Sequence, residues 1–319
     1  MWQPHRDDLT AVPQAPEEPQ LRPLLNRAER LRQRGYAVPP NWMRPRRRWT
    51  GCGCVAGASI LVILLSAAYF LMPGRSNLLV LGIDYTPPWH AIGRSDTIIL
   101  TTFVPSRSYI GMLSIPRDLW VAIPGVGENR INTAHFFAES QQPGSGPYAA
   151  MQTIETNFGV AVDYYIRIRF EGFKEMVNTL GGLVIELPEP MAGYPAGRHH
   201  LTGNKALAFV RDRSNSDDFF RMAHGQFLVK ALMRQLLNPN SWPRLPGVAI
   251  ALSHSIDTNV PAFLWPRLAF TALRLGPDGI DSRIIARDMV TPYTTDQGAS
   301  VLLPDWSAIT PILLEMFGQ

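Results

Sequence analysis

The feature that most constrains this chain is an uncharged, largely apolar run of 22 residues from Gly51 to Met72, with the sequence GCGCVAGASILVILLSAAYFLM. At about 1.5 Å per residue, a helix of this length crosses the roughly 30 Å hydrocarbon layer of a membrane. A buried helix of a soluble protein normally carries a polar stripe, and this run has none, so it predicts one transmembrane helix. Four arginines lie just before the run and one, Arg75, lies just after it. The positive-inside rule then predicts a cytoplasmic N-terminus, with residues 73–319 outside the cell membrane.

The run differs from the segments that direct cleavage or lipid attachment during export. It begins 50 residues into the chain, is longer than the usual core of a signal peptide, and is followed by no A-x-A pattern. Its two cysteines, Cys52 and Cys54, precede the apolar part of the run, whereas the cysteine of a lipobox follows an apolar run. We expect inert thiols in a membrane helix, with palmitoylation as the alternative. Two cysteines also exclude a disulfide scaffold and a four-cysteine zinc module.

The positive charge of the chain is confined to its N-terminal arm. Residues 1–50 contain ten Arg against five acidic residues, whereas the rest of the chain has 20 basic and 21 acidic residues. The arm also contains eight prolines, so we expect a flexible, basic, cytoplasmic segment with one short helix around residues 24–34. The arm shows no helix-turn-helix pattern and the body is nearly neutral, so we expect no nucleic-acid partner.

Strand and helix patterns alternate along the body, which we treat as one domain over residues 73–319. β-branched and apolar runs predict strands at residues 77–83, 97–104, 109–115, 162–170, 183–187 and 283–286. Helical patterns fall at residues 131–139, 148–158, 173–180, 202–211 and 218–237. This order predicts an α/β fold in which helices pack on a mixed central sheet.

Charged residues cluster where these strands end and where these helices begin or end. The clusters contain Asp84, Arg94, Asp96, Arg117, Asp118, Arg211, Arg213, Asp217, Asp218 and Arg221. Loops at strand ends commonly bind ligands, and Arg is suited to bidentate contacts with phosphate. Two carboxylates near several Arg suggest a hydrated divalent cation that bridges to phosphate. The alternatives are turn residues, helix N-caps and surface ion pairs.

Other catalytic patterns are missing or weak. The sequence contains no G-x-S-x-G, P-loop or HExxH pattern. The pair His199-His200 could bind a metal, but no third ligand lies at a useful spacing, so we expect exposed loop residues.

Taken in order, these clusters resemble the LytR–CpsA–Psr family of cell-envelope proteins over residues 77–237. The matching motifs are Leu-Gly-Ile-Asp84, Arg94-Ser-Asp96-Thr-Ile, Ser-Ile-Pro-Arg117-Asp118, Arg130-Ile-Asn132-Thr-Ala134, Leu180-Gly-Gly182, Leu201-Thr-Gly-Asn-Lys-Ala206-Leu-Ala-Phe-Val-Arg211-Asp-Arg213 and Asp218-x-x-Arg221. The resemblance implies a three-layer α/β/α sandwich with an apolar groove. It also implies transfer of a glycopolymer phosphate from a polyprenyl-pyrophosphate-linked donor to a cell-wall acceptor such as peptidoglycan.

The resemblance also implies roles for individual residues. Pyrophosphate would be bound by Arg94, Arg117, Arg211, Arg213 and Arg221, with Gln226 as a further candidate. Asp84 and Asp96 would hold Mg²⁺ or Mn²⁺, and Asp218 would orient an Arg or the acceptor. Asp84, Asp96, Arg117 and Asp218 are therefore the expected catalytic residues.

The chain departs from the family pattern at two places. The Arg that usually follows Gly-x-Asp-x is absent, because Asp84 is followed by Tyr85-Thr86. On the long helix, Gly225 replaces the first of two Gln that the family usually carries. These departures leave open a protein that binds or hydrolyses polyprenyl phosphates without transfer. A membrane-bound transcriptional attenuator, a label the family has carried, is a further alternative that only the basic arm would favour.

Overall fold

The computed structural model describes residues 27–35, 50–71, 74–84, 93–212, 218–253 and 256–318. The chain divides into two units, residues 1–62 and residues 63–319. Helix α1 (Arg27–Gln33) lies in the first unit, inside the stretch where a short helix is predicted. Helix α2 (Thr50–Leu71) coincides with the predicted apolar helix. Over the described residues, no helix combines the length and the apolar character that crossing a membrane requires.

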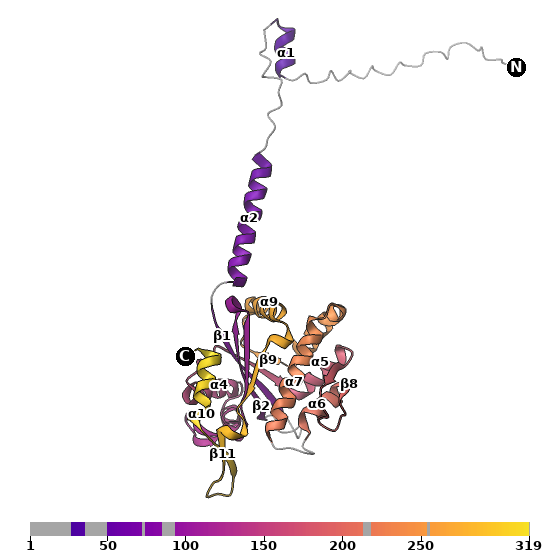
Figure 1. The fold of residues 1–319 in the computed structure, drawn as a ribbon. Coiled ribbons are helices and arrows are strands. Elements are labelled where there is room, and N and C mark those ends of the chain that lie inside the picture. Colours follow the sequence, from indigo (N-terminus) through magenta and orange to yellow (C-terminus); the bar gives the residue numbers. More distant parts are fainter. Residues whose placement is uncertain are drawn as a thin grey trace, which may run out of the picture. The chain divides into compact units, whose positions relative to one another are not determined.

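A six-stranded sheet organises the second unit (Figure 1). Its strands, in spatial order, are β10 (Asp281–Ile284), β3 (Tyr109–Ser114), β2 (Arg94–Val104), β1 (Ser76–Asp84), β6 (Tyr164–Arg169) and β9 (Ile256–Thr258). The pairs β1–β6 and β10–β3 are parallel, and the other neighbours are antiparallel. The predicted mixed sheet of an α/β fold is therefore confirmed.

The strand β1 shows why the sheet lies at the centre. Leu78, Leu79, Leu81 and Ile83 are each 1 % exposed or less, so side chains of alternating direction are buried on both faces. A strand buried on both faces is encoded by a nearly continuous apolar run, which is the pattern that predicted it.

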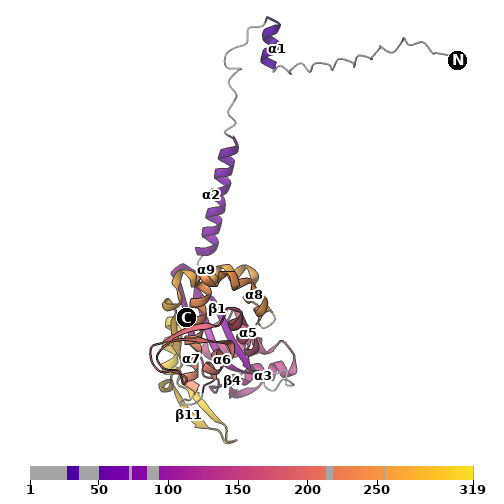
Figure 2. The same ribbon diagram turned by 90° about the vertical axis from the view of Figure 1, so that its right-hand side faces the viewer.

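Helices cover both faces of this sheet (Figures 1 and 2). On one face, Leu81 and Leu100 pack with side chains of α3 (Thr133–Gln141), α4 (Gly146–Phe158) and α10 (Trp306–Phe317). On the other, Ile99 and Met112 pack with α9 (Trp265–Leu275) and α7 (Asp218–Leu237). Helices α5 (Phe170–Thr179) and α6 (Gly203–Arg211) pack beside α7, and α8 (Leu245–Ser253) packs on α5.

Three two-stranded sheets complete the unit, and the sequence patterns revealed only one of their strands. They are β4 (Trp120–Ile123) with β5 (Gly127–Arg130), β7 (Leu183–Leu187) with β8 (Gly197–Leu201), and β11 (Val290–Thr294) with β12 (Ser300–Pro304). The prediction that His199 and His200 lie in a loop is wrong, because both belong to β8, which pairs with β7. The His200 Nε2 atom lies 2.8 Å from the carbonyl oxygen of Gly181, which makes that ring part of local structure.

Candidate functional site

A cavity of about 310 Å³ lies between β2, β3 and the helices α6 and α7. Among the predicted site residues, it brings together Asp96, Arg211 and Arg221. Its other lining residues are Thr97, Ile98, Ile99, Ser114, Ile115, Phe170, Val210, Met222 and Gly225. The charged clusters around Asp96, Arg211 and Arg221, the first and last of which are more than 100 residues apart in the sequence, therefore meet around one cavity.

A β-bulge directs Asp96 toward this cavity. In the antiparallel pairing of β1 with β2, Gly82 lies opposite Thr97, but the next residue, Ile83, lies opposite Ser95. Asp96 is the extra residue, and bulges of this kind commonly re-aim a side chain near an active site. The register also places Asp84 opposite Arg94 at the end of the same ladder. The side chain of Asp84 lies outside the described residues.

Arg117 is held beside Asp96 by ion pairs. Its Nη1 atom lies 2.7 Å from Oδ1 of Asp96, and its Nε atom lies 3.5 Å from Oδ2 of Asp118. The second oxygen of Asp118 lies 3.4 Å from Nε of Arg130. Two carboxylates thus fix the orientation of the Arg117 guanidinium, which is the arrangement that a positioned phosphate ligand needs.

Arg211 is fixed by an aromatic ring. It ends α6, and its guanidinium carbon lies 4.6 Å from the ring centroid of Phe170, in a cation–π contact. The start of α6 packs closely on α5, because a Cβ atom added at Gly203 would lie 2.2 Å from the carbonyl oxygen of Lys174. Close packing at one end of α6 and stacking at the other set the position of Arg211. Arg213 lies outside the described residues.

Helix α7 contributes Arg221, Met222 and Gly225 to the cavity wall. No heavy atom lies within 4 Å of a Cβ added at Gly225, so this position faces open space. A second cavity of about 100 Å³ also reaches Gly225, and its lining is almost entirely apolar. The two cavities share Thr97, Ile99, Phe170, Val210 and Gly225. The polar cavity therefore adjoins an apolar one.

Gln226 does not line either cavity. It is 7 % exposed, and its amide nitrogen donates to Oγ of Ser114 over 2.9 Å and to the carbonyl oxygen of Arg283. This residue joins α7 to β3 and β10, which does not support the predicted contact with pyrophosphate. His224 is 6 % exposed against the ring of Phe209, and burial lowers its pKa, with Asp212 acting in the opposite direction.

The remaining predicted residues lie at the margins of the described site. Arg94 is exposed, with its guanidinium carbon 5.7 Å from the ring centroid of Phe136. Asp218 begins α7, but its side chain lies outside the described residues. The structure thus groups Asp96, Arg117, Arg211 and Arg221, and it leaves the side chains of Asp84, Arg213 and Asp218 undescribed.

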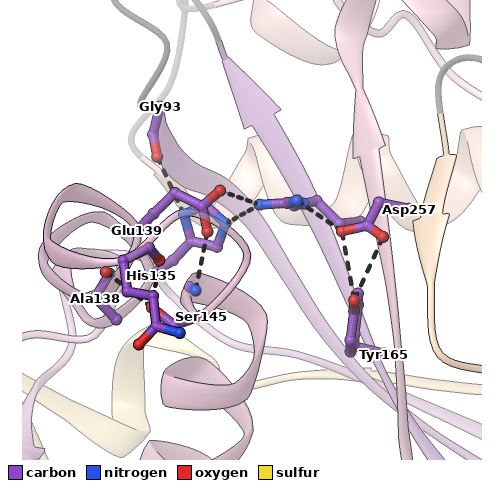
Figure 3. A network of polar contacts seen from close by, with 10 residues as sticks. Gly93, His135, Ala138, Glu139, Ser145, Tyr165 and Asp257 are labelled. Carbon is purple, nitrogen blue, oxygen red and sulfur yellow. Dashed lines mark hydrogen bonds and ion pairs between the residues drawn. The ribbon is translucent and has the colours of Figure 1, made fainter.

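A buried polar network behind β2 was missed by the sequence analysis (Figure 3). Arg167 of β6 lies 3.0 Å from Oε1 of Glu139, and it also pairs with Asp257 of β9. His135 is fully buried, with Nδ1 3.2 Å from the carbonyl oxygen of Gly93 and Nε2 3.2 Å from Nη1 of Arg167. Gly93 directly precedes β2, so this network holds the start of the strand that carries Arg94 and Asp96. The four-residue spacing of His135 and Glu139 on α3 is the signal that could have revealed it.

The environment of this network keeps the imidazole neutral. Burial, together with the nearby charge of Arg167, lowers the pKa of His135 to about 4. A neutral ring donates from Nδ1 to Gly93 and accepts from Arg167 at Nε2, which agrees with both distances. Burial alone would raise the pKa of Glu139, but the backbone N–H groups of Gly144 and Gly146 and the charge of Arg167 hold it below its ordinary value.

The carboxylates near the cavity suit a cation that is completed by phosphate. No group of three or more His, Cys, Asp or Glu side chains occurs within the described ranges, so an all-protein metal cage is not seen there. Mg²⁺ is usually bound by one or two carboxylates with substrate phosphates and water. Asp96 at the cavity wall and the strand position of Asp84 opposite Arg94 fit that donor set.

Comparison with known proteins identifies one matching family and several similar chains. The model of the LytR_cpsA_psr family matches residues 71–302. Over 190 residues the chain is 31 % identical to the polyisoprenyl-teichoic acid–peptidoglycan teichoic acid transferase TagU of Oceanobacillus iheyensis, which covers 58 % of each protein. It is 29 % identical over 196 residues to the regulatory protein MsrR of Staphylococcus aureus, covering 59 % of this chain and 57 % of that one. The chain thus spans somewhat over half the length of these curated relatives.

Solved structures show the same fold. TagV of B. subtilis superposes with a TM-score of 0.63 at 23 % identity, covering 77 % of this chain and 98 % of that one. TagT bound to LIIa-WTA superposes with a TM-score of 0.59 at 22 % identity, covering 77 % and 91 %. At these identities the likeness establishes the architecture of the domain.

Proposed function

The chain belongs to the LytR_cpsA_psr family, and on that premise we propose that it transfers a glycopolymer phosphate from a polyprenyl-pyrophosphate-linked donor to peptidoglycan. The observation that carries this proposal is the pair of adjoining cavities, one lined by Asp96, Arg211 and Arg221 and the other by apolar side chains around Gly225. A ligand that fills both parts must join an anionic group to an apolar chain. The name of the TagU relative, a polyisoprenyl-teichoic acid–peptidoglycan transferase, describes a protein that acts on such a donor.

In this proposal, a hydroxyl of the acceptor attacks the phosphorus that bears the glycopolymer. The new P–O bond forms as the bond to the bridging oxygen breaks, the hydroxyl proton passes to water, and polyprenyl phosphate leaves with the electron pair. Negative charge gathers on the phosphate oxygens, where Arg117, Arg211 and Arg221 supply positive charge that the fold has already oriented. Arg94 and Arg213 would add to this charge, and Asp218 would orient the acceptor or an Arg.

Asp84 and Asp96 would hold Mg²⁺ or Mn²⁺ next to the pyrophosphate. A bound divalent cation would neutralise charge on the phosphate oxygens. We expect Asp84→Asn to weaken binding of Mn²⁺, measured by electron paramagnetic resonance, while the thermal unfolding temperature stays unchanged. An unchanged Mn²⁺ affinity would remove Asp84 from the metal site.

The proposal includes a location at the cell membrane, where the lipid donor resides. It is supported by the uncharged run of residues 51–72, which follows Arg44, Arg46, Arg47 and Arg48. The N-terminal arm would then be cytoplasmic and the domain would lie outside. Protease added to intact cells should remove the domain and leave the arm protected, and the reverse result would contradict this topology.

The test of function uses the full chain in detergent with Mg²⁺, a short polyprenyl-pyrophosphate-linked sugar and peptidoglycan oligomers. Mass spectrometry should detect a sugar joined to the glycan through a phosphodiester. The product should be lost in Arg117→Ala and kept in Arg198→Ala, which changes an exposed Arg of β8.

Other outcomes decide between the alternatives. Free polyprenyl phosphate without any acceptor product would indicate a hydrolase. Lipid that is retained without turnover would indicate a binding protein, which the open position at Gly225 and the residues after Asp84 would then explain.

A further inference from the structure

One end of the domain exposes large apolar side chains that form a surface we call the aromatic face. It consists of Trp242, Ile250, Phe263, Trp265, Phe270 and Leu273. These side chains are between 36 % and 65 % exposed, and they come from α8, α9 and two short 3₁₀ helices, η3 (Pro239–Arg244) and η4 (Ala262–Leu264). We propose that the aromatic face docks against the headgroup layer of an anionic lipid bilayer. This inference rests on the proposed membrane location and adds that the domain itself touches the lipid.

The sequence of α8 is unusual for a helix at a water-exposed surface. Its nine residues, LPGVAIALS, contain no charged side chain. Pro246, Gly247, Ala249 and Ile250 are nevertheless exposed. A surface helix normally places polar or charged residues on its outer side, because those groups remain hydrated. The outer side of α8 is instead suited to an apolar environment.

Helix α9 repeats this pattern with aromatic residues. Trp265, Ala269, Phe270 and Leu273 are exposed and recur at the spacing of one helical face. Figure 2 shows α8 and α9 at the same end of the domain. Tryptophan and other aromatic side chains are enriched at membrane–water interfaces, where the ring is partly apolar and the indole N–H remains hydrated.

The charges around the aromatic face favour a lipid surface over an apolar protein partner. Residues 239–275 contain Arg244, Arg267 and Arg274 against one acidic residue, Asp257. Asp257 pairs with Arg167 inside the polar network, so it does not offset these arginines. Arg side chains close to an anionic membrane are attracted to its surface.

The aromatic face is continuous with the last turn of α2. The ring centroid of Phe70 lies 4.8 Å from that of Phe270, and the hydroxyl of Tyr69 donates to the carbonyl oxygen of Phe263. Phe70 also lines a cavity of about 580 Å³ together with Trp242, Phe270 and Leu273. The apolar run that is predicted to enter a membrane therefore reaches the domain at this face.

Helix α7 connects the aromatic face to the site. Arg221 and Gly225 line the polar cavity, Gly225 and Leu228 line the apolar one, and Met233 and Leu237 line the cavity at the aromatic face. These positions follow one another along the length of α7 at spacings of three to five residues. The 16 residue steps from Arg221 to Leu237 correspond to about 24 Å of helix. A docked bilayer would thus adjoin the end of α7 at Leu237, and the phosphate-binding arginines would lie near its other end, at Arg221.

The experiment uses the full chain in vesicles of phosphatidylcholine and phosphatidylglycerol, with and without bromine on the acyl chains as a fluorescence quencher. The fluorescence of the unchanged chain minus that of Trp242→Phe or Trp265→Phe gives the emission of the replaced indole alone. We expect bromine to quench at least about half of that difference emission, as for indoles at the membrane interface. The emission lost in the control Trp120→Phe should not be quenched, because Trp120 lies in β4 and donates to Glu128.

A second pair of variants tests the face without altering tryptophan. The double variant Phe263→Asp, Leu273→Asp replaces apolar side chains that are 64 % and 55 % exposed with carboxylates. Because both positions are exposed, the fold should persist, while bromine should no longer quench Trp265. Leu314→Asp, at an exposed position of α10, should leave quenching unchanged.

Flotation of the vesicles separates this inference from the proposed location. Chains that do not float with the vesicles would overturn both. Chains that float but show no quenching of Trp242 or Trp265 would overturn the docking alone, as would a cross-linked dimer that protects these indoles from both lipid and water.

Discussion

The two faces of the central sheet are built from similar apolar strands but are packed differently. The face under α3, α4 and α10 is filled by one large core, and its buried charges are paired in the network of His135, Glu139 and Arg167. The face under α6 and α7 retains two adjoining cavities, with arginines beside one of them. Protein interiors normally contain few voids larger than a water molecule, so the cavities on this face indicate a place kept for a ligand.

This difference in packing indicates that the paired charges on the two faces of the sheet have distinct roles. Glu139 and Arg167 have side chains only 10 % and 12 % exposed, and each finds its partner within the protein. Asp96 and Arg117 are 28 % and 22 % exposed, and Asp96 lines a cavity. The first pair holds the fold together, and the second pair is available to a ligand. The predictions below separate these purposes, from the largest expected effect to the smallest.

The largest effect is expected on the packed face. Arg167→Ala should lower the free energy of unfolding by about 3–5 kcal/mol, because it leaves the buried carboxylate of Glu139 without its partner and removes the ion pair with the partly exposed Asp257. Urea unfolding followed by circular dichroism measures this loss. A loss below about 1 kcal/mol, the range of an exposed ion pair, would contradict the assignment.

The cavity face should respond in activity rather than in stability. Arg117→Ala removes an oriented charge next to Asp96 and should lower the transfer rate by about 10²–10³-fold. The midpoint of urea unfolding should change little, because both side chains are partly exposed. Arg117→Lys keeps the charge without the planar fork, and it should recover only part of the rate. Equal losses of rate and of stability in Arg117→Ala would show that this pair also serves the fold.

The packed face should also weaken in mild acid. The pKa of His135 is about 4 in the folded chain and about 6.5 when unfolded, so the unfolded state binds more protons between these values. Stability should therefore fall as pH decreases from about 6.5 to 4, by up to about 3 kcal/mol. The lowered pKa of Glu139 extends the loss to lower pH. His135→Gln should flatten the dependence of unfolding free energy on pH above 4, and an unchanged slope would contradict the buried neutral ring.

The smallest effect concerns two glycines that differ in the space around them. Gly225→Ala should raise the free energy of unfolding by about 1 kcal/mol, since the new Cβ meets no atom within 4 Å and Ala favours a helix. Gly146→Ala, on the packed face, should be destabilising, because its Cβ would lie 2.7 Å from Oε2 of Glu139 and 2.8 Å from the ring of His135. Thermal unfolding of both variants checks this contrast. A lower free energy of unfolding for Gly225→Ala would mean that the cavity at Gly225 closes in solution.

Much of the site could be predicted because its residues sit in short motifs at strand and helix ends. The patterns around Asp96, Arg117, Arg211 and Arg221 predicted a common anion site, and the structure brings these four together. Gln226 was assigned from its neighbours along the chain, but its direction depends on packing against Ser114, which is 112 positions away. The network at His135 was missed because its partners come from α3, β6 and β9.

The sequence by itself determined the apolar helix at residues 50–71, the central strands, the long helix α7 and the family, because each depends on local composition, on periodicity or on contiguous motifs. Only the tertiary structure decided which charges are buried in pairs and which border a cavity. It also gathered side chains from η3, α8, η4 and α9 into one exposed apolar face. These outcomes depend on contacts between residues that are distant in sequence, and no local pattern specifies the space between packed elements.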